Sequence, residues 1–215
     1  MIFALERVSN PDIEPVSLEE MKLHLREYDS MTEMDDTISS LITAAREWVE
    51  QFTGRALVDQ TWRLTIERDG TLPADTVSNA AVCGQWKMAR ENEISLRKSP
   101  VLTVESVISV DTAGAETTIE AETYALRLAD SKYPKVVALN GAKWTQQYLQ
   151  ITFRAGYADR AASPIQDATA VPARYKQAIK LWVQANYNPN VDEIDALMRA
   201  AENLIKGERV ELSLA

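Results

Sequence analysis

The stretch from residue 35 to residue 54 carries the clearest helical pattern of hydrophobic and polar positions. Its apolar residues occupy an arc of about 120° on a helix, the width of a stripe that faces a core. Asp35 and Asp36 suit an N-cap and the positive end of the helix, and Gly54 suits the position where a helix ends. The pattern predicts a helix over 36–53, and we expect Trp48→Ala to cost about 3–5 kcal/mol. The predicted structural core of this helix is Ile38, Leu41, Ile42, Ala45, Trp48, Val49 and Phe52.

Three further helices are predicted from their start and stop signals. Ser17-Leu18-Glu19-Glu20 forms a capping box that opens a short helix reaching about Glu27. Pro172 suits the first turn of a helix over 172–187 that is apolar on more than one side, so it lies deep in a bundle or also meets another subunit. The last helix begins near Asp192 and ends at Gly207. Its apolar stripe is Ile194, Leu197, Met198, Ala201, Leu204 and Ile205.

Between the two helix pairs the period changes to that of β-strands. Within this region, residues 68–92 read as a functional or mobile loop. Residues 1–16, before the first helix, read as extended. Short antiparallel strands at the spacing seen here predict a small sandwich or barrel. The predicted strands are 60–67, 93–97, 106–110, 117–120, 124–128, 135–139 and 147–153.

These elements predict an α+β fold with an inserted β lobe. The N- and C-terminal helix pairs, in residues 1–57 and 158–207, form one helical bundle, and residues 58–157 form the antiparallel β lobe. Residues 208–215 form an extended C-terminal tail in which Val210, Leu212 and Leu214 alternate with polar residues. The tail is either disordered or adds as a strand to the sheet edge of another chain.

Composition narrows the class of protein. Of the 215 residues 46% are hydrophobic, and no run approaches the roughly 18 apolar residues of a membrane span. The N-terminus lacks the pattern of a signal peptide, so we expect the protein to be made and kept in a cytoplasm. The net charge of -9 repels nucleic acid in the absence of a basic patch, and none is visible. The single cysteine, Cys83, excludes an intramolecular disulfide and a thiolate metal cluster.

Candidate catalytic groups are few. A nucleophilic triad would need His24, the only histidine, and Cys83 has no activating neighbour in sequence. Two acidic clusters could be read as metal or acid–base sites, but helix capping explains both: Glu33, Asp35 and Asp36, and Asp192, Glu193 and Asp195. We therefore expect no catalytic, cofactor or metal site.

The tryptophans suggest contact surfaces more readily than chemistry. Most of them read as core, because they form no spaced platform with basic partners. Trp86 and Trp144 stand in loop-like contexts and are the better candidates for exposed contacts.

Several motifs together resemble the head-tail connector (adaptor) proteins of tailed phages. The resemblance covers most of residues 15–187, whereas residues 69–92 and the segment after Asn188 depart from it. It is carried by Pro15-Val16-Ser17-Leu18-Glu19-Glu20, Lys22-Leu23-His24-Leu25, the helix 42–50 leading into Thr53-Gly54-Arg55-Ala56-Leu57, Gln60-Thr61-Trp62-Arg63-Leu64, Ser99-Pro100-Val101-Leu102, Val104-Glu105-Ser106-Val107, Ile151-Thr152-Phe153-Arg154-Ala155-Gly156-Tyr157, Val171-Pro172 and Lys176-Gln177-Ala178-Ile179.

The resemblance implies a non-enzymatic virion component without a cofactor or a membrane. Proteins of this kind form a ring, generally a dodecamer, that bridges the portal at the capsid vertex to a stopper or tail protein and lets DNA pass through its channel. Because they engage the portal with terminal segments, we expect Val210, Leu212 and Leu214 to contact it. For the subunit interface we expect Tyr175, Leu181, Trp182 and Tyr187. The alternatives are a stopper or tail-completion protein of the same neck and, more remotely, a small hydrolase using Cys83 or His24.

Overall fold

The computed structural model describes residues 2–27, 32–67, 92–111, 113–158, 168–187 and 191–210. They divide into two compact units, each assembled from separate stretches of the chain. The sheet unit contains residues 2–10 and 60–155, and the helical unit contains residues 11–59 and 156–210.

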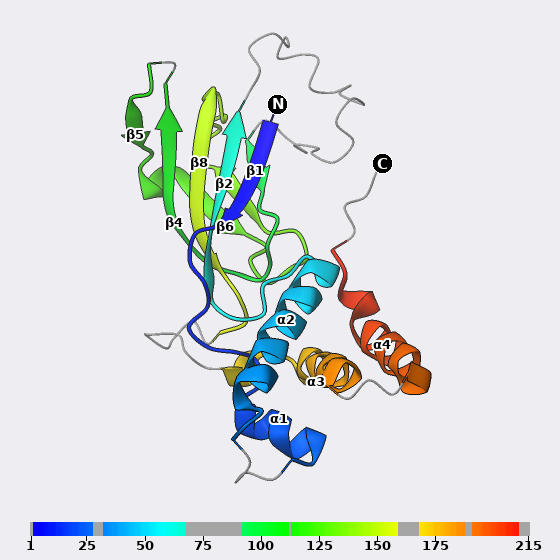
Figure 1. The fold of residues 1–215 in the computed structure, drawn as a ribbon. Coiled ribbons are helices and arrows are strands. Elements are labelled where there is room, and N and C mark those ends of the chain that lie inside the picture. Colours follow the sequence, from blue (N-terminus) through cyan, green and yellow to red (C-terminus); the bar gives the residue numbers. More distant parts are fainter. Residues whose placement is uncertain are drawn as a thin grey trace. The chain divides into compact units, whose positions relative to one another are not determined.

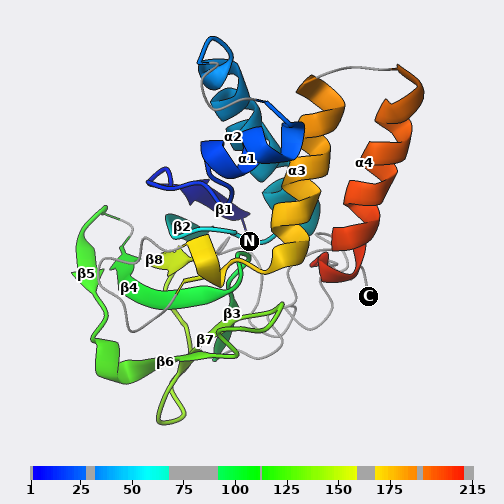
Figure 2. The ribbon, with the colours of Figure 1, turned by 90° about the horizontal axis from the view of Figure 1, so that it is seen from below.

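Four α-helices make up most of the helical unit, and α3 is the helix that packs against the other three. In Figures 1 and 2, α3 lies between α2 and α4. This position explains why the segment 172–187 is apolar on more than one side. The elements are α1 (Leu18–Leu25), α2 (Asp35–Thr53), α3 (Ala173–Tyr187) and α4 (Val191–Ile205), with the short 3-10 helices η3 (Ala168–Ala170) and η4 (Lys206–Glu208).

Local capping chemistry sets the start of α1 and the end of α2. The predicted cap of α1 is confirmed, because the Ser17 hydroxyl accepts a hydrogen bond from the Glu20 N–H at 3.1 Å. The predicted end of α2 is also confirmed, because Gly54 adopts the left-handed conformation with φ 73°. The predicted capping by Asp35 is wrong: α2 begins at Asp35 itself, and Met34 is the N-cap residue. The Asp35 carboxylate instead accepts a hydrogen bond from Lys22 Nζ at 2.8 Å.

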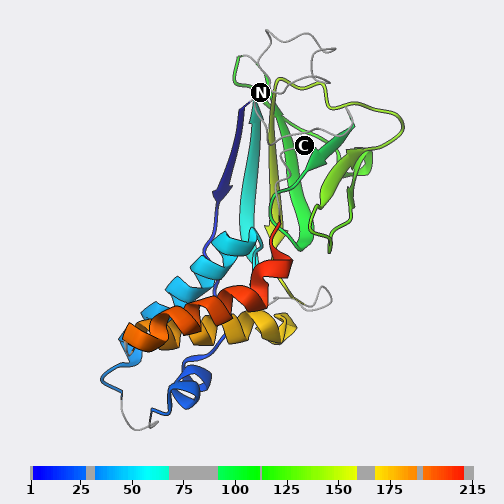
Figure 3. The ribbon, with the colours of Figure 1, turned by 90° about the vertical axis from the view of Figure 1, so that its right-hand side faces the viewer.

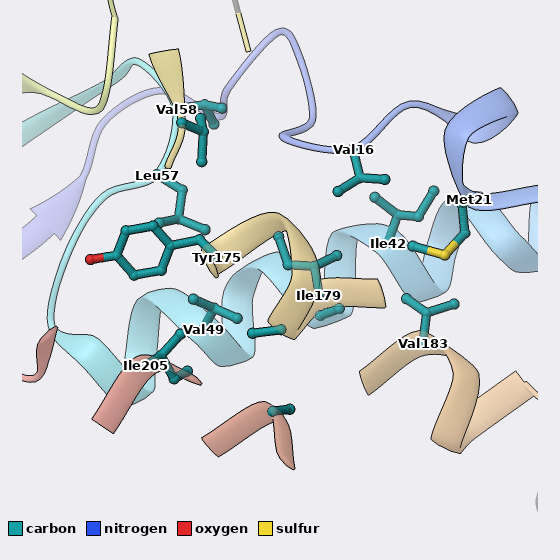
Figure 4. Packing of buried hydrophobic residues seen from close by; sticks show 14 of the residues in the cluster. Val16, Met21, Ile42, Val49, Leu57, Val58, Tyr175, Ile179, Val183 and Ile205 are labelled. Carbon is teal, nitrogen blue, oxygen red and sulfur yellow. The ribbon is translucent and has the colours of Figure 1, made fainter. Parts of the chain in front are cut away.

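The apolar stripe of α2 faces the core of the helical unit. Ile38, Ile42, Ala45 and Val49 are buried there. They pack with buried residues of α1 and α3, and Figure 4 shows the cluster around Met21, Ile179 and Val183. Leu41, Trp48 and Phe52 lie at the edge of the stripe and are only partly buried.

A buried ion pair fixes the backbone that follows α2. Arg46 donates to Glu14 at 2.9 Å and to Oε2 of Glu50 at 3.0 Å. The other carboxylate oxygen of Glu50 accepts the N–H of Leu57 at 2.8 Å. The Glu50 side chain thus accepts hydrogen bonds both from the buried guanidinium of Arg46 and from the backbone N–H of Leu57 in the segment after α2.

The sheet unit contains two antiparallel sheets, a five-stranded one in the order β1-β2-β8-β4-β5 and a three-stranded one in the order β3-β7-β6. The α+β class predicted from the sequence is confirmed. The strand spacing predicted a sandwich or a barrel, and the barrel is wrong, because among the described strands each sheet ends in two unpaired edges. Figure 3 shows β1, in dark blue, at one edge of the larger sheet. The strands are β1 (Ile2–Arg7), β2 (Gln60–Glu67), β3 (Glu93–Ser95), β4 (Val101–Val110), β5 (Glu116–Thr118), β6 (Tyr124–Arg127), β7 (Lys135–Ala138) and β8 (Tyr148–Ala155).

Strand β8 is the centre of the larger sheet. Its residues alternate strictly between partly buried and buried along the whole strand. Ile151 is paired with Leu64 of β2 on one side and with Val107 of β4 on the other, and all three are fully buried. The buried face of this sheet is therefore one row of apolar side chains repeated across strands.

Candidate assembly surface

Three aromatic side chains of the helical unit form a partly exposed cluster, here called the aromatic patch: Trp48, Phe52 and Trp182. The ring centroids of Trp48 and Phe52 are 5.7 Å apart, and those of Trp48 and Trp182 are 6.4 Å apart. The Arg209 guanidinium lies 5.5 Å from the centre of the Phe52 ring, within the range of a cation–π contact.

The aromatic patch follows from helical spacing. Trp48 and Phe52 are four residues apart on α2, which places them one above the other on the same face. Trp182 extends this face onto α3. Large aromatic rings that are half covered by their own chain are the residue type that anchors protein–protein contacts.

The four residues expected at a subunit interface lie in different environments. Tyr175 is fully buried in the core of the helical unit. Leu181, Trp182 and Tyr187 are partly buried and pack against the edge of that core. Burial, together with the hydrogen bond that its hydroxyl donates to Glu27 at 3.1 Å, raises the pKa of Tyr187. Of the four, these three keep surface that a neighbour can cover.

The last described residues are attached to the helical unit by a group of charged side chains, here called the C-terminal clasp: Arg55, Arg174 and Glu208. The Glu208 carboxylate contacts Arg55 Nη2 at 3.3 Å and also contacts the Arg174 guanidinium. Arg55 Nε donates a second hydrogen bond to the Glu208 backbone carbonyl at 3.2 Å. A planar guanidinium with several donors suits this double attachment.

Two tyrosines complete the surroundings of the clasp. Arg55 donates to the Tyr157 hydroxyl at 3.0 Å, and the hydroxyls of Tyr157 and Tyr175 are 3.2 Å apart. Burial is the main cause that raises the pKa of Tyr175 far above its usual range, and the Tyr157 hydroxyl adds to it. Tyr175 therefore acts here as a neutral hydrogen-bonding group.

The residues expected to contact a portal lie at and beyond the clasp. The Val210 N–H donates to the Thr53 carbonyl at 2.8 Å, and the Val210 side chain is partly buried. Leu212 and Leu214 lie outside the described residues.

The residues considered for chemistry have structural contacts instead, as far as the structure describes them. His24 Nε2 is 3.0 Å from the Gln184 side-chain oxygen, and Asp35 pairs with Lys22. Among the described residues, no group of three or more histidine, cysteine, aspartate or glutamate side chains is arranged to hold a metal ion. Cys83 and Trp86 fall outside the described residues, as does the side chain of Asp192.

One expected surface contact is wrong. Trp144 is buried, with 4% of its surface exposed, and its indole N–H donates to the Asn92 carbonyl at 2.9 Å. The loop-like sequence around Trp144 suggested exposure. The sequence does not show that its ring lies against that of Tyr124, at a tilted angle and with the ring centroids 6.3 Å apart.

Sequence reasoning missed the clasp altogether. Arg55 and Glu208 are 153 residues apart, and each is an ordinary charged residue in a turn-like context. The helix stop at Gly54 predicted a turn, but no periodic signal links this turn to the end of the last helix.

No helix among the described residues is long and apolar enough to cross a membrane.

Comparison with solved structures shows the same fold in proteins of gene transfer agent (GTA) particles. A chain in the neck of an empty GTA particle, computed with C6 symmetry, matches with a TM-score of 0.72 and 22% identity over 96% of this chain and 95% of that one. A chain in the virion of a native GTA particle matches with a TM-score of 0.71 and 23% identity over 95% and 94% of the two chains. A chain in the neck of a native GTA particle, computed with C12 symmetry, matches with a TM-score of 0.69 and 23% identity over 96% and 94%.

A comparison with curated proteins finds no match. The family model of phage gp6-like head-tail connector proteins matches residues 15–123, about half of the chain. This family is structural rather than enzymatic. The chain therefore belongs to the phage gp6-like head-tail connector protein family, and its place is the virion neck between head and tail.

Proposed function

We propose that this protein is a ring adaptor of the neck, which joins the portal at the capsid vertex to the stopper or tail and leaves a channel for DNA. One observation carries the proposal. The fold matches almost the whole length of a chain in GTA necks that were computed with C6 and C12 symmetry. A dodecamer is the ring that fits the higher of these symmetries.

The helical unit offers surface for the contact between copies. A ring needs a heterologous interface, in which one surface of a subunit meets a different surface of the next. Leu181, Trp182 and Tyr187 of α3 are the partly exposed apolar residues that we assign to it, and the aromatic patch continues this surface onto α2. Covering them adds roughly 25 cal/mol for each Å² of apolar surface removed from water.

The charge of the protein suits a channel through which DNA moves. The formal net charge is -9. An acidic wall does not displace the counterions of DNA, so it forms few lasting contacts with the phosphates. DNA therefore passes without sequence-specific binding.

The C-terminal segment is the part that we assign to the portal. Val210, Leu212 and Leu214 alternate with polar residues, which is the pattern of a strand that adds to the sheet edge of a partner.

Mass measurement tests the ring. We expect light scattering to show a ring of twelve copies, alone or after mixing with the portal protein, and electron microscopy of the mixture to show density on the portal's tail-facing side. A protein that stays monomeric in both conditions refutes the proposal. A protein that binds the tail tube and not the portal is a stopper or tail-completion protein instead.

A pair of variants tests the surface on α3. Leu181→Asp places a charge on that surface, and we expect it to abolish the ring while circular dichroism shows that the monomer is still folded. Its urea midpoint falls as well, because Leu181 also packs against the edge of the core. Leu128→Asp is the control, because it makes the same chemical change at a leucine of the sheet unit that is 60% exposed. Loss of the ring in the control, or its survival in Leu181→Asp, contradicts the assignment of the interface to α3.

A further inference from the structure

The C-terminal segment is held at a defined point of the helical unit before it reaches its last five residues. At that point the Val210 N–H donates to the carbonyl of Thr53, the last residue of α2. The Val210 side chain packs over Gly54, where an added Cβ would lie 3.3 Å from the Val210 Cβ. The chain at Val210 thus lies along the C-terminal turn of α2.

The clasp reinforces this attachment with charge. The side chains of Arg55 and Glu208 are only 6% and 22% exposed, so water screens their attraction little. Arg55 holds Glu208 by its carboxylate and by its backbone carbonyl, which fixes the orientation of the chain as well as its position. Arg174, from α3, contacts the same carboxylate from another element.

The clasp lies beyond the residues that hold α4 in place. Ala201 and Ile205 of α4 are fully buried in the core of the helical unit. Glu208 follows both of them and ends η4, immediately before the chain turns toward Val210. The clasp therefore acts on the direction of the chain after α4 rather than on the packing of α4.

We infer that Arg55, Arg174 and Glu208 are positioning residues that fix the direction in which the C-terminal segment leaves the helical unit, so that it meets the portal already oriented. This inference rests on the proposed function, in which that segment contacts the portal. An oriented segment loses less conformational entropy on binding. The free energy of binding is therefore more favourable, and the affinity is higher. Without the clasp, only the contacts of Val210 with Thr53 and Gly54 restrain the chain at this point, so the residues beyond Val210 reach the portal from a less restricted chain.

A double-mutant cycle separates positioning from a merely structural role. The variants are Glu208→Gln, the truncation that removes residues 211–215, and the two combined, each measured for affinity to the portal protein. We expect Glu208→Gln to weaken binding about 5- to 20-fold in the full-length chain, the lower range of coupling between sites. In the truncated chain we expect the same substitution to change the affinity less than twofold, because the segment that it orients is gone.

Two further measurements complete the test. Amide hydrogen exchange at Val210 should become faster in Glu208→Gln, since its bond to Thr53 reports the attachment directly. The matched control is Glu6→Gln, which makes the same chemical change in an exposed ion pair of the sheet unit, with Arg63 at 3.2 Å. The control should change neither the affinity nor the exchange at Val210.

The outcomes distinguish the inference from the function on which it rests. If truncation weakens binding and Glu208→Gln does not, the inference is overturned and the proposed function stands. If Glu208→Gln weakens binding equally in both backgrounds, its role is structural and the inference is overturned as well. If neither the wild type nor the truncated chain binds the portal, the proposed function fails and takes the inference with it.

Discussion

Glu50 is the residue whose loss tests the packing of the helical unit most directly. Its side chain is 6% exposed and satisfies two donors, Arg46 Nη1 at 3.0 Å and the Leu57 N–H at 2.8 Å. Glu50→Ala leaves a buried guanidinium with one of its partners removed and a buried backbone donor without its acceptor. Both consequences destabilise the folded state.

The magnitude can be worked from these contacts. Breaking a buried ion pair by removing one partner costs about 3–5 kcal/mol. The low end applies here, since Arg46 keeps its bond to Glu14 at 2.9 Å. The orphaned Leu57 N–H adds about 1 kcal/mol or more. We expect a total of about 4 kcal/mol, which lowers the urea midpoint by about 2 M for an m-value of about 2 kcal/mol/M.

Glu47→Ala is the matched control. Glu47 stands on the same helix and contacts the same arginine at 3.7 Å, but its side chain is 50% exposed. An exposed ion pair contributes about 0–1 kcal/mol, so its midpoint should barely move. Equilibrium urea unfolding followed by tryptophan fluorescence measures both variants. Similar midpoints for Glu50→Ala and Glu47→Ala would refute the reasoning that burial sets the cost.

Three further predictions concern stability. Gly156→Ala should destabilise the protein by about 3 kcal/mol or more in urea unfolding. Gly156 has φ 150°, and a Cβ added to it would lie 2.3 Å from the Val58 backbone. Gly207→Ala is the control and should be neutral, because a Cβ added there meets nothing within 4 Å. The raised pKa of Tyr175 means that its contribution to stability is fully present below the unfolded tyrosine pKa of about 10 and is lost as the pH rises above it. Urea midpoints between pH 8 and 11 should therefore fall less steeply for Tyr175→Phe than for the wild type, and parallel curves would contradict this. Trp48→Ala should lower the free energy of unfolding by about 2 kcal/mol in the same assay. This is less than the cost of about 3–5 kcal/mol expected for a fully buried tryptophan, because Trp48 is only partly buried. A decrease above about 4 kcal/mol would show that Trp48 belongs to the core.

Periodicity predicted the elements whose packing is decided by one face. The apolar stripe of α2 and the strict alternation of β8 are examples, because burial of one face makes hydrophobic residues recur with the period of the helix or the strand. The end of α2 at Gly54 was also predictable, since few residues other than glycine adopt its conformation readily.

Features that depend on contacts between residues far apart in the sequence show no such periodicity. Strand β1 reads only as extended, and it becomes a strand by pairing with β2, where Leu5 lies opposite Leu64. The choice between a barrel and open sheets depends on which edges meet, which no single segment encodes. The same applies to the clasp, whose charged residues are unremarkable until the fold brings them together.

The division of the chain into interleaved units has a consequence for its synthesis. The helical unit needs residues 11–59 and residues 156–210, and residues 60–155, which form most of the sheet unit, are made between them. A growing chain that has reached Ala155 has therefore exposed the apolar stripe of α2, including Ile42 and Val49, before α3 exists to cover it. Folding intermediates with such uncovered stripes are prone to aggregation. Until the ribosome has delivered the last quarter of the polypeptide, α1 is the described helix that contacts α2 and can shield part of that stripe in the nascent protein.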